Sequence, residues 1–449
     1  MTSATQSGHL YRYPFHSRLD GADGAPQLRL ATSQDAESTV YPHFFDGKLL
    51  RPHLTAQLLN GLARVVSTRY YIPPNMLNRM IAERDPVVTS GGGMLRFEGF
   101  SACCSSYVRV DLTPDSYSGK IVGQGTTNVD FNQPMRASLV SVRDDDRLAL
   151  KVGADEVSLK RGFEEVIERK VDLPLRWLKG FVEIQSYQSA MELRFDIPKI
   201  EAVRFLRSLP RSATAKSTFY VVPSGKGLRL SQVKTAEAVP ISGLQRLHLL
   251  ADMAPLADRL RIYAQPSGQA SEWQLQLGPL SVSITMTAEV MRGFSGEGQV
   301  LQDLAAVDDS RLARVRAALK WQSIIDIADI AQTAALPEDE VRKLLAVLGS
   351  RGLVGYDLAN AAYFHRELPF DLGAVEEMHP RLVNARRLAG DGKVNLLRRT
   401  ESEIEARVAG TDVEHRVLIE GENARCTCPW HSKHQGARGP CKHILATQI

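Results

Sequence analysis

Apolar positions near the start of the chain follow the spacing of amphipathic helices. Pro52 suits a first helical position, and apolar residues then recur three or four positions apart, at Leu54, Leu58, Leu62, Val65 and Val66. A second set follows Pro73 and Pro74 and comprises Met76, Leu77, Met80 and Ile81. The segments LRFEGF and YVRVDL, residues 95–100 and 107–112, alternate as strands do. We therefore predict a mixed helical and stranded domain over residues 1–146.

The next part of the chain is richer in strand patterns. Alternation marks RLALKVGADEVSL, FVEIQSY, MELRFDI, DRLRIYAQ, EWQLQLG and LSVSITMTA, and helical spacing marks residues 200–208 and 244–256. These segments predict a strand-rich α+β domain over residues 147–305. The chain as a whole is predicted to be an α+β protein of several domains.

Two features of the first domain are possible functional sites. The polar, glycine-containing stretch GQGTTNVDFNQPMR places Asp130 and Asn132 where they could contact a polar partner, although turn-stabilising side chains are the simpler account. Cys103 and Cys104 are adjacent, and adjacent strand residues point to opposite faces, so we interpret them as packing residues.

Residues 306–372 predict a third unit of three helices and a hairpin. Its apolar positions are Leu312, Val315, Leu319, Ile324, Ile325, Ile327, Ile330, Val341, Leu344, Leu345 and Leu348. Pro337 suits a first helical position, Gly349 and Gly352 mark the end of that helix, and residues 353–370 can form a two-stranded wing. This order resembles a winged-helix domain, whose third helix binds DNA. Here that helix begins with Glu338, Asp339 and Glu340, which repel phosphates. Basic residues further along could compensate, namely Arg342, Lys343 and Arg351, so DNA recognition, protein docking and a purely structural role all stay open.

Residues 373–449 contain the most specific chemical pattern. Cys426 and Cys428 are followed after twelve residues by Cys441 and His443. Three thiolates and one imidazole are a complete tetrahedral ligand set for one structural Zn²⁺, with no position left for a substrate water. Alternation before Cys426 predicts strands, and Pro440 suits the first position of a last helix. We therefore predict a ββα finger over about residues 405–449.

The run RCTCPWHSKHQGARGPCKHILA resembles a SWIM-type zinc finger, in which the Cys-x-Cys and Cys-x-His residues bind zinc. That resemblance implies Cys426, Cys428, Cys441 and His443 as the ligands. His431 and His434 lie in the gap, and we interpret them as loop residues. One departure is that only six residues follow His443 in this sequence, so the last helix can have barely two turns.

Over its length the chain also resembles long bacterial SWIM-finger proteins that carry the finger at the C-terminal end. The segments behind this resemblance are RFEGF, GTTNVDFNQPMR, GLVGYD, AYFHRELPF and RGPCKH. Such proteins resemble companions of MoxR-type AAA+ ATPases and von Willebrand factor A domain proteins. SWIM fingers elsewhere occur in transposase-like, helicase-associated and recombination-accessory proteins. The resemblance thus implies binding to nucleic acid or to protein.

Composition and the absence of known motifs limit the classes of protein to which the chain can belong. The chain is 43% hydrophobic and 24% charged, has no apolar run near the length of a membrane span, and contains five cysteines without a secretory signal. This favours a cytoplasmic protein whose thiols bind metal rather than form disulfides. No phosphate-binding P-loop, GxSxG elbow or HExxH motif occurs, so we expect neither nucleotide binding nor enzymatic activity.

Charge is concentrated at the end of the chain. Residues 381–449 hold 12 Lys and Arg against 8 Asp and Glu, an excess of 12 − 8 = +4 that equals the net charge of the whole chain. The candidates for phosphate contact beside the metal are Arg425, Lys433, Arg438 and Lys442, with Arg386, Arg387, Arg398 and Arg399 nearby in sequence. A merely solvated basic surface is the alternative.

Two binding functions follow from these patterns, and an enzyme in the N-terminal part is a third class that would require a pocket with convergent titratable groups. The first is a zinc-binding adaptor that binds DNA through the basic tail. The alternative is a protein-interaction scaffold in which the finger and the winged-helix-like unit dock partner proteins.

Overall fold

The computed structural model describes most of the chain. The described residues are 18–20, 27–30, 45–71, 86–121, 123–128, 131, 133–152, 175–210, 217–291, 293–294, 301, 309–368, 379–400, 402–410, 413–421, 423–436 and 438–449. The helix predicted after Pro73 and Pro74 lies outside them, as do Asp130 and Asn132. None of the described helices is long and apolar enough to cross a membrane.

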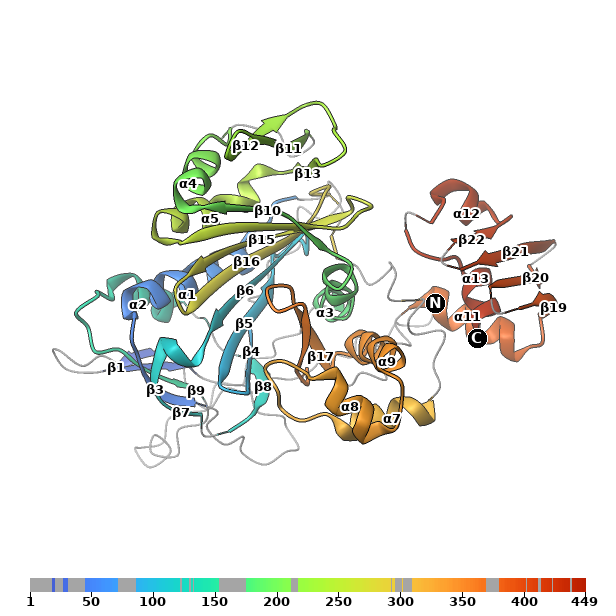
Figure 1. Ribbon diagram of the computed structural model, residues 1–449, viewed down its shortest axis with the longest axis horizontal. Coiled ribbons are helices and arrows are strands. Elements are labelled where there is room, and N and C mark those ends of the chain that lie inside the picture. The colour runs from blue at the N-terminus through green and yellow to red at the C-terminus, as the bar shows by residue number, and fades with distance from the viewer. Residues whose placement is uncertain are drawn as a thin grey trace, which may run out of the picture.

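An eight-stranded antiparallel sheet forms the centre of the body (Figure 1). Its strands, in spatial order, are β10 (Glu192–Pro198), β14 (Arg259–Ala264), β15 (Ala270–Leu277), β16 (Leu280–Thr287), β6 (Ser106–Leu112), β5 (Met94–Phe100), β4 (Val87–Gly91) and β8 (Gly125–Asn128). β16 pairs with β6, so strands from the ranges 1–146 and 147–305 share one sheet and one hydrophobic core. Alternation predicts each strand but not which strand it pairs with, which explains why the sequence suggested two domains.

The two faces of this sheet differ in chemistry. On one face Phe97, Val110 and Val282 lie in register and are fully buried. Helix α1 (Pro52–Ser67), as predicted from its spacing, packs on this face against β5 and β6. The approach is close, because a Cβ on Gly99 would lie 2.6 Å from Val66. On the opposite face the buried side chains are largely polar.

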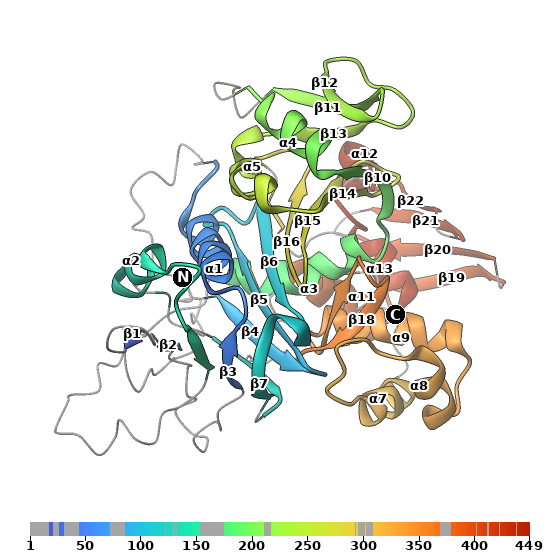
Figure 2. The same cartoon turned by 60° about the vertical axis from the view of Figure 1, so that its left-hand side comes forward.

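Smaller elements surround the central sheet (Figures 1 and 2). A five-stranded sheet has the order β1 (Arg18–Asp20), β2 (Gln27–Leu30), β9 (Ala149–Val152), β3 (Phe45–Leu49) and β7 (Tyr117–Ile121). A three-stranded sheet comprises β12 (Gly227–Ser231), β11 (Thr218–Ser224) and β13 (Val239–Ser242). The helical pieces are η2 (Pro114–Ser116), α2 (Gln133–Ser141), α4 (Lys199–Arg207), η4 (Leu244–Leu247), α5 (His248–Met253) and η5 (Ala254–Leu256).

The two vicinal cysteines lie in the turn between β5 and β6 rather than on a strand. Cys104 adopts a left-handed conformation with φ 56° and belongs to the hydrophobic core. Cys103 is half-buried, and its sulfur lies 3.2 Å from the Ser105 hydroxyl. The two thiols therefore point in different directions because of the turn, and not because they alternate along a strand as the sequence suggested.

The segment FVEIQSY is helical, which corrects the strand predicted there. It belongs to α3 (Leu175–Gln188), whose buried residues Trp177, Phe181 and Ile184 recur at helical spacing. Glu183, Gln185 and Gln188 are also buried. Because the helix is enclosed on more than one side, both its apolar and its polar positions are buried. The sequence of this segment therefore alternates like that of a strand.

Residues 309–368 form three helices and a hairpin, α7 (Asp309–Ala318), α8 (Ile327–Ala334), α9 (Glu338–Ser350), β17 (Val354–Asp357) and β18 (Ala362–His365), around their own core. The Asp326 carboxylate accepts from the Ala328 and Asp329 amides and starts α8, so Ile324 and Ile325 precede that helix. Pro337 is the N-cap of α9 rather than its first helical residue.

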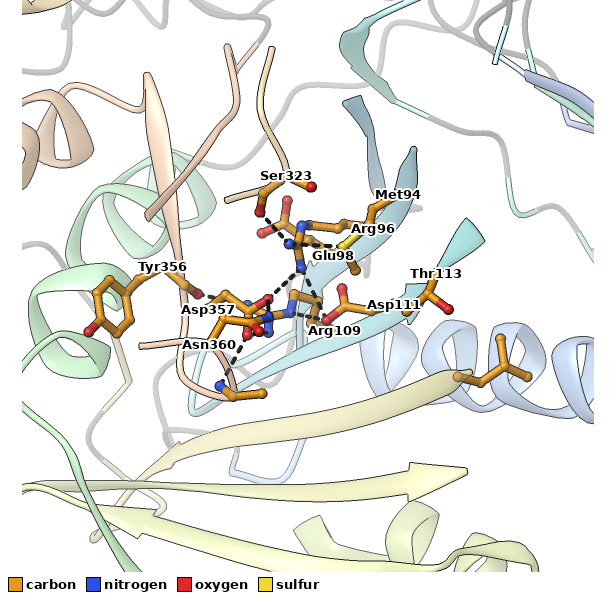
Figure 3. A network of polar contacts seen from close by, with 12 residues as sticks. Met94, Arg96, Glu98, Arg109, Asp111, Thr113, Ser323, Tyr356, Asp357 and Asn360 are labelled. Atoms are coloured by element: carbon orange, nitrogen blue, oxygen red, sulfur yellow. Dashed lines mark hydrogen bonds and ion pairs between the residues drawn. The ribbon is translucent and has the colours of Figure 1, made fainter. Parts of the chain in front are cut away.

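A network of buried charges joins this unit to the polar face of the central sheet (Figure 3). Arg96 Nη1 lies 3.0 Å from Asp357 Oδ2 and 3.3 Å from Asp111 Oδ2. Arg109 Nε lies 3.0 Å from Asp111 Oδ2, and its Nη2 lies 3.4 Å from Asp357 Oδ1. The two guanidinium groups and two carboxylates balance in charge, as buried ions require.

A second buried pair continues the network, since Arg366 Nη1 lies 2.5 Å from Glu98 Oε1. Burial alone would raise the pKa of Asp357, but Arg96 and Arg109 hold that pKa well below its ordinary value. Asp357 therefore stays ionised between the sheet and the hairpin. The unit of residues 309–368 is fixed to the body by charge pairs that neither part can satisfy alone.

Replacing Asp357 with Asn should lower the free energy of unfolding by about 3–5 kcal/mol, because two buried arginines would share one remaining carboxylate. Asp252→Asn is the matched control, since its pair with Arg64 is about half exposed and contributes at most about 1 kcal/mol. Urea unfolding at neutral pH measures both. Equal effects of the two changes would contradict the structural role of Asp357.

The same carboxylate predicts a pH dependence. The folded pKa of Asp357 lies below that of an unfolded Asp, about 3.9, so its contribution is present above that pH and is lost as the pH falls towards the folded value. Asp357→Asn should therefore lose stability less steeply than the unchanged protein when unfolding is measured below about pH 4. If the free energy of unfolding fell equally steeply with pH in both proteins, Asp357 would not be the source of this pH dependence.

Candidate metal centre

The C-terminal unit is larger than the predicted finger. Its four-stranded sheet has the order β19 (Val394–Arg399), β20 (Glu403–Ala409), β21 (Glu414–Glu420) and β22 (Asn423–Cys426), and its helices are α11 (Pro380–Gly390), α12 (Pro429–His434) and α13 (Lys442–Gln448). α11 and α13 pack on each other and share a core with Val417 and Ile419. α11 and β19 thus belong to this unit, although the sequence placed them before the finger.

Local structure brings the first two cysteines to the same side. Cys426 ends β22 and Cys428 is the N-cap of α12, and both are buried while Thr427 between them is exposed. This is the two-residue period of an extended segment, as predicted. The His431 amide also donates to Cys428 Sγ at 3.4 Å.

The other pair lies at the start of the last helix. Cys441 is the N-cap of α13, with an extended backbone, and His443 lies in the first turn. Pro440 precedes the cap instead of occupying the first helical position. α13 has only seven residues, but Ile444, Leu445 and Ala446 are buried, so packing supports a helix that would be marginal alone.

The four side chains converge on one point. The three Sγ atoms and the His443 nitrogen lie within 4.8 Å of one another, and all four residues are buried. His443 Nδ1 lies 3.8 Å from Cys426 Sγ and 4.0 Å from Cys441 Sγ. A tetrahedral zinc with bonds of about 2.0–2.3 Å needs ligand atoms only slightly closer together. The arrangement fits one zinc ion in a closed, structural coordination shell.

The electrostatics also favour a divalent cation. The Cys426 thiol donates to the Cys441 sulfur and lowers the pKa of Cys441 to about 4. That contact, with burial, raises the pKa of Cys426 above its ordinary value. Three sulfurs this close together repel one another as thiolates, and zinc would balance that charge and bind all three in this form.

Neither additional histidine joins the four ligands. His434 packs its ring on Trp430, with centroids 4.4 Å apart, and His431 is half-buried on the same helix. His415, on β21, packs against the ligand His443 with centroids 4.4 Å apart. No sequence pattern predicts this last contact, because β21 meets α13 only in the folded unit.

The predicted phosphate-contacting residues do not form one patch. Arg425 is exposed and precedes Cys426 on β22, so its side chain points to the sheet face opposite the metal ligands. Arg438 lies beside α11, because its carbonyl accepts from Arg381 Nη1 at 2.9 Å. Lys433 is exposed on α12 and Lys442 is half-buried on α13. Arg425 is thus separated from the residues of the helical side.

The exposed sheet face is balanced in charge. Arg398 lies 2.9 Å from Glu403, Arg416 lies 2.7 Å from Glu405, and Arg407 lies 3.8 Å from Glu414. By contrast, α11 and residues 423–449 contain no Asp or Glu. The basic excess of the tail therefore belongs to its helical side.

Residues 415–447 match the SWIM zinc finger family, which identifies a SWIM zinc finger in this part of the chain. No curated protein matches the chain. Among solved structures, proliferating cellular nuclear antigen from Entamoeba histolytica is similar with a TM-score of 0.34 and 10% sequence identity, over 55% of this chain and 99% of that chain. A similarity this low adds nothing to the functional argument.

Replacing Cys441 with Ser should reduce bound zinc from about one equivalent and expose the amides of residues 441–448 to solvent, because a structural site loses its closed shell. Metal analysis after dialysis and amide hydrogen exchange measure these effects. Cys103→Ser, outside the cluster, is the control. Full zinc retention by Cys441→Ser would mean that the ligand set is wrong.

Proposed function

We propose that the SWIM zinc finger of this chain is a zinc-ordered nucleic-acid-binding module, and that its helical side contacts phosphates. The observation that carries the proposal is the asymmetry of charge within the C-terminal unit. Its helical segments carry Arg387, Lys433, Arg438 and Lys442 and contain no Asp or Glu, whereas three arginines of the sheet face are paired with glutamates, namely Arg398, Arg407 and Arg416. Basic side chains without acidic neighbours are the ones that can displace counterions from a nucleic acid.

Zinc has an ordering role in this proposal. Lys433 and Arg438 lie between the two ligand pairs, and Lys442 lies between Cys441 and His443. Metal binding would therefore fix the backbone that carries these cations and lower the entropy lost on contact with phosphate. Because all four zinc ligands come from the protein, the proposed activity is binding rather than catalysis.

A second candidate function rests on residues 309–368, which we propose to be a winged-helix-like unit with a protein-docking role. In α9 the exposed first turn is acidic, and the later residues Leu344, Leu345 and Leu348 are buried. Gln185 of α3 also donates to the Gly349 carbonyl. The exposed side of this helix carries Glu338 in the first turn and Arg342 in the next, and the two side chains form an ion pair at 2.9 Å. A surface of mixed charge favours a protein partner over a phosphate backbone.

The resemblance to long bacterial SWIM-finger proteins implies the partners to try first, a MoxR-type AAA+ ATPase and a von Willebrand factor A domain protein. Reversing Glu338 and Asp339 to Lys should weaken capture of such a partner by immobilised full-length protein about tenfold, because like charges would then face each other across the interface. Reversing Glu192 and Glu414 to Lys makes the same charge change on β10 and β21 and serves as the control, because both side chains are exposed and lie on other elements. Capture that is unchanged by the charge reversal would contradict docking through α9.

Nucleic-acid binding is tested by two triple variants that remove the same charge. Lys433→Ala, Arg438→Ala and Lys442→Ala together should weaken binding and reduce the salt slope by roughly one unit for each lost phosphate contact. Arg398→Ala, Arg407→Ala and Arg416→Ala should leave the slope unchanged, because these residues are paired with glutamates. Fluorescence anisotropy of the zinc-loaded protein with labelled single- and double-stranded DNA measures both. Absence of binding at low salt would overturn the proposal.

A further inference from the structure

The loop that carries Cys441 has little support of its own. Gln435, Gly436 and Gly439 adopt positive φ angles of 45°, 80° and 73°, so the loop turns sharply after α12. Among the described residues of this loop, its backbone bonds run from the Gln435 amide to the His431 carbonyl and from the Gly439 amide to the Gly436 carbonyl. Two glycines make such a loop costly to order.

One side chain from another helix holds this loop. Arg381 lies in the first turn of α11. Its Nη1 donates to the carbonyls of Arg438 and Pro440, each at 2.9 Å. Its guanidinium carbon also lies 4.7 Å from the centre of the Trp430 ring. Arg381 therefore joins three segments, α11, α12 and the loop before α13.

These contacts lie beside the metal ligands. Pro440 immediately precedes Cys441, and Trp430 follows Cys428 by two positions. A single guanidinium thus connects the backbone next to one ligand pair with the side chain next to the other. Arginine suits this position because its planar fork donates in fixed directions while its face stacks on an aromatic ring, which a lysine ammonium cannot do.

We propose that Arg381 is a positioning residue of the zinc centre and that α11 is an essential part of the zinc-binding module. Arg381 lies before the family match, which covers residues 415–447. By fixing the Arg438 and Pro440 carbonyls, it orders the loop before the metal binds, so that less entropy is lost when Cys441 and His443 close the coordination shell. This inference rests on the metal centre and not on nucleic-acid binding.

Metal affinity of the full-length protein tests the proposal. Arg381→Ala should weaken zinc binding about 10–100-fold, as loss of a residue that orients ligands does. Arg381→Lys keeps the charge and one donor group, and it should recover only part of that loss. Arg387→Ala is the control, because Arg387 is exposed on the same helix and bonds to Asn384 within it. Competition with a chromophoric chelator measures all three.

Two further measurements separate positioning from ligation and from general unfolding. Cobalt(II) bound to Arg381→Ala should keep the ligand-field spectrum of a tetrahedral site with three sulfurs and one nitrogen, whereas Cys441→Ser should lose it. In the zinc-loaded Arg381→Ala protein, amide exchange should quicken in residues 435–442 and stay slow in β20 and β21. Native metal affinity in Arg381→Ala, or an equal loss in Arg387→Ala, would overturn the proposal. Faster exchange throughout β20 and β21 would overturn it too.

Discussion

The enclosure of α3 is the constraint on which the arrangement of the whole molecule depends. Trp177, Phe181 and Ile184 belong to the core of the central sheet, and Val182 belongs to the core of the C-terminal unit. Gln185 donates to the Gly349 carbonyl at the end of α9. One helix therefore contacts all three parts of the protein. Its polar residues can be buried only because Gln185 and Gln188 find partners in neighbouring parts.

The buried charges complement this helix. Arg96 and Arg109 would be expensive to bury on a sheet face exposed to an apolar neighbour, and Asp357 would be equally expensive within a hairpin. Bringing the sheet and residues 309–368 together satisfies both sets at once, with balanced charge. Separating the two parts would leave buried ions uncompensated, so the network disfavours other arrangements of these parts. The body and the three-helix unit consequently form one structure.

The C-terminal unit is stabilised by a metal site and a small core instead of by buried ion pairs. Its sheet and α13 share a small core, and the ligand set sits where β22, α12 and α13 meet. Metal binding supplies folding free energy that so small a core lacks. The contact of Arg381 with the loop before Cys441 extends this module to α11, which the spacing of cysteines does not reveal.

The sequence by itself determined the local features of the structure, which depend on residues close together in the chain. The spacing of Cys426, Cys428, Cys441 and His443 specified a zinc site, because each pair is local and its geometry follows from strand and helix periodicity. Most strands of the central sheet and the helix after Pro52 were predictable for the same reason. Tertiary structure alone decided which strands pair, that the segment around Phe181 is a helix, and that Arg425 and Arg438 lie on different faces. These depend on partners distant in sequence, and periodicity within a segment cannot encode the identity of such partners.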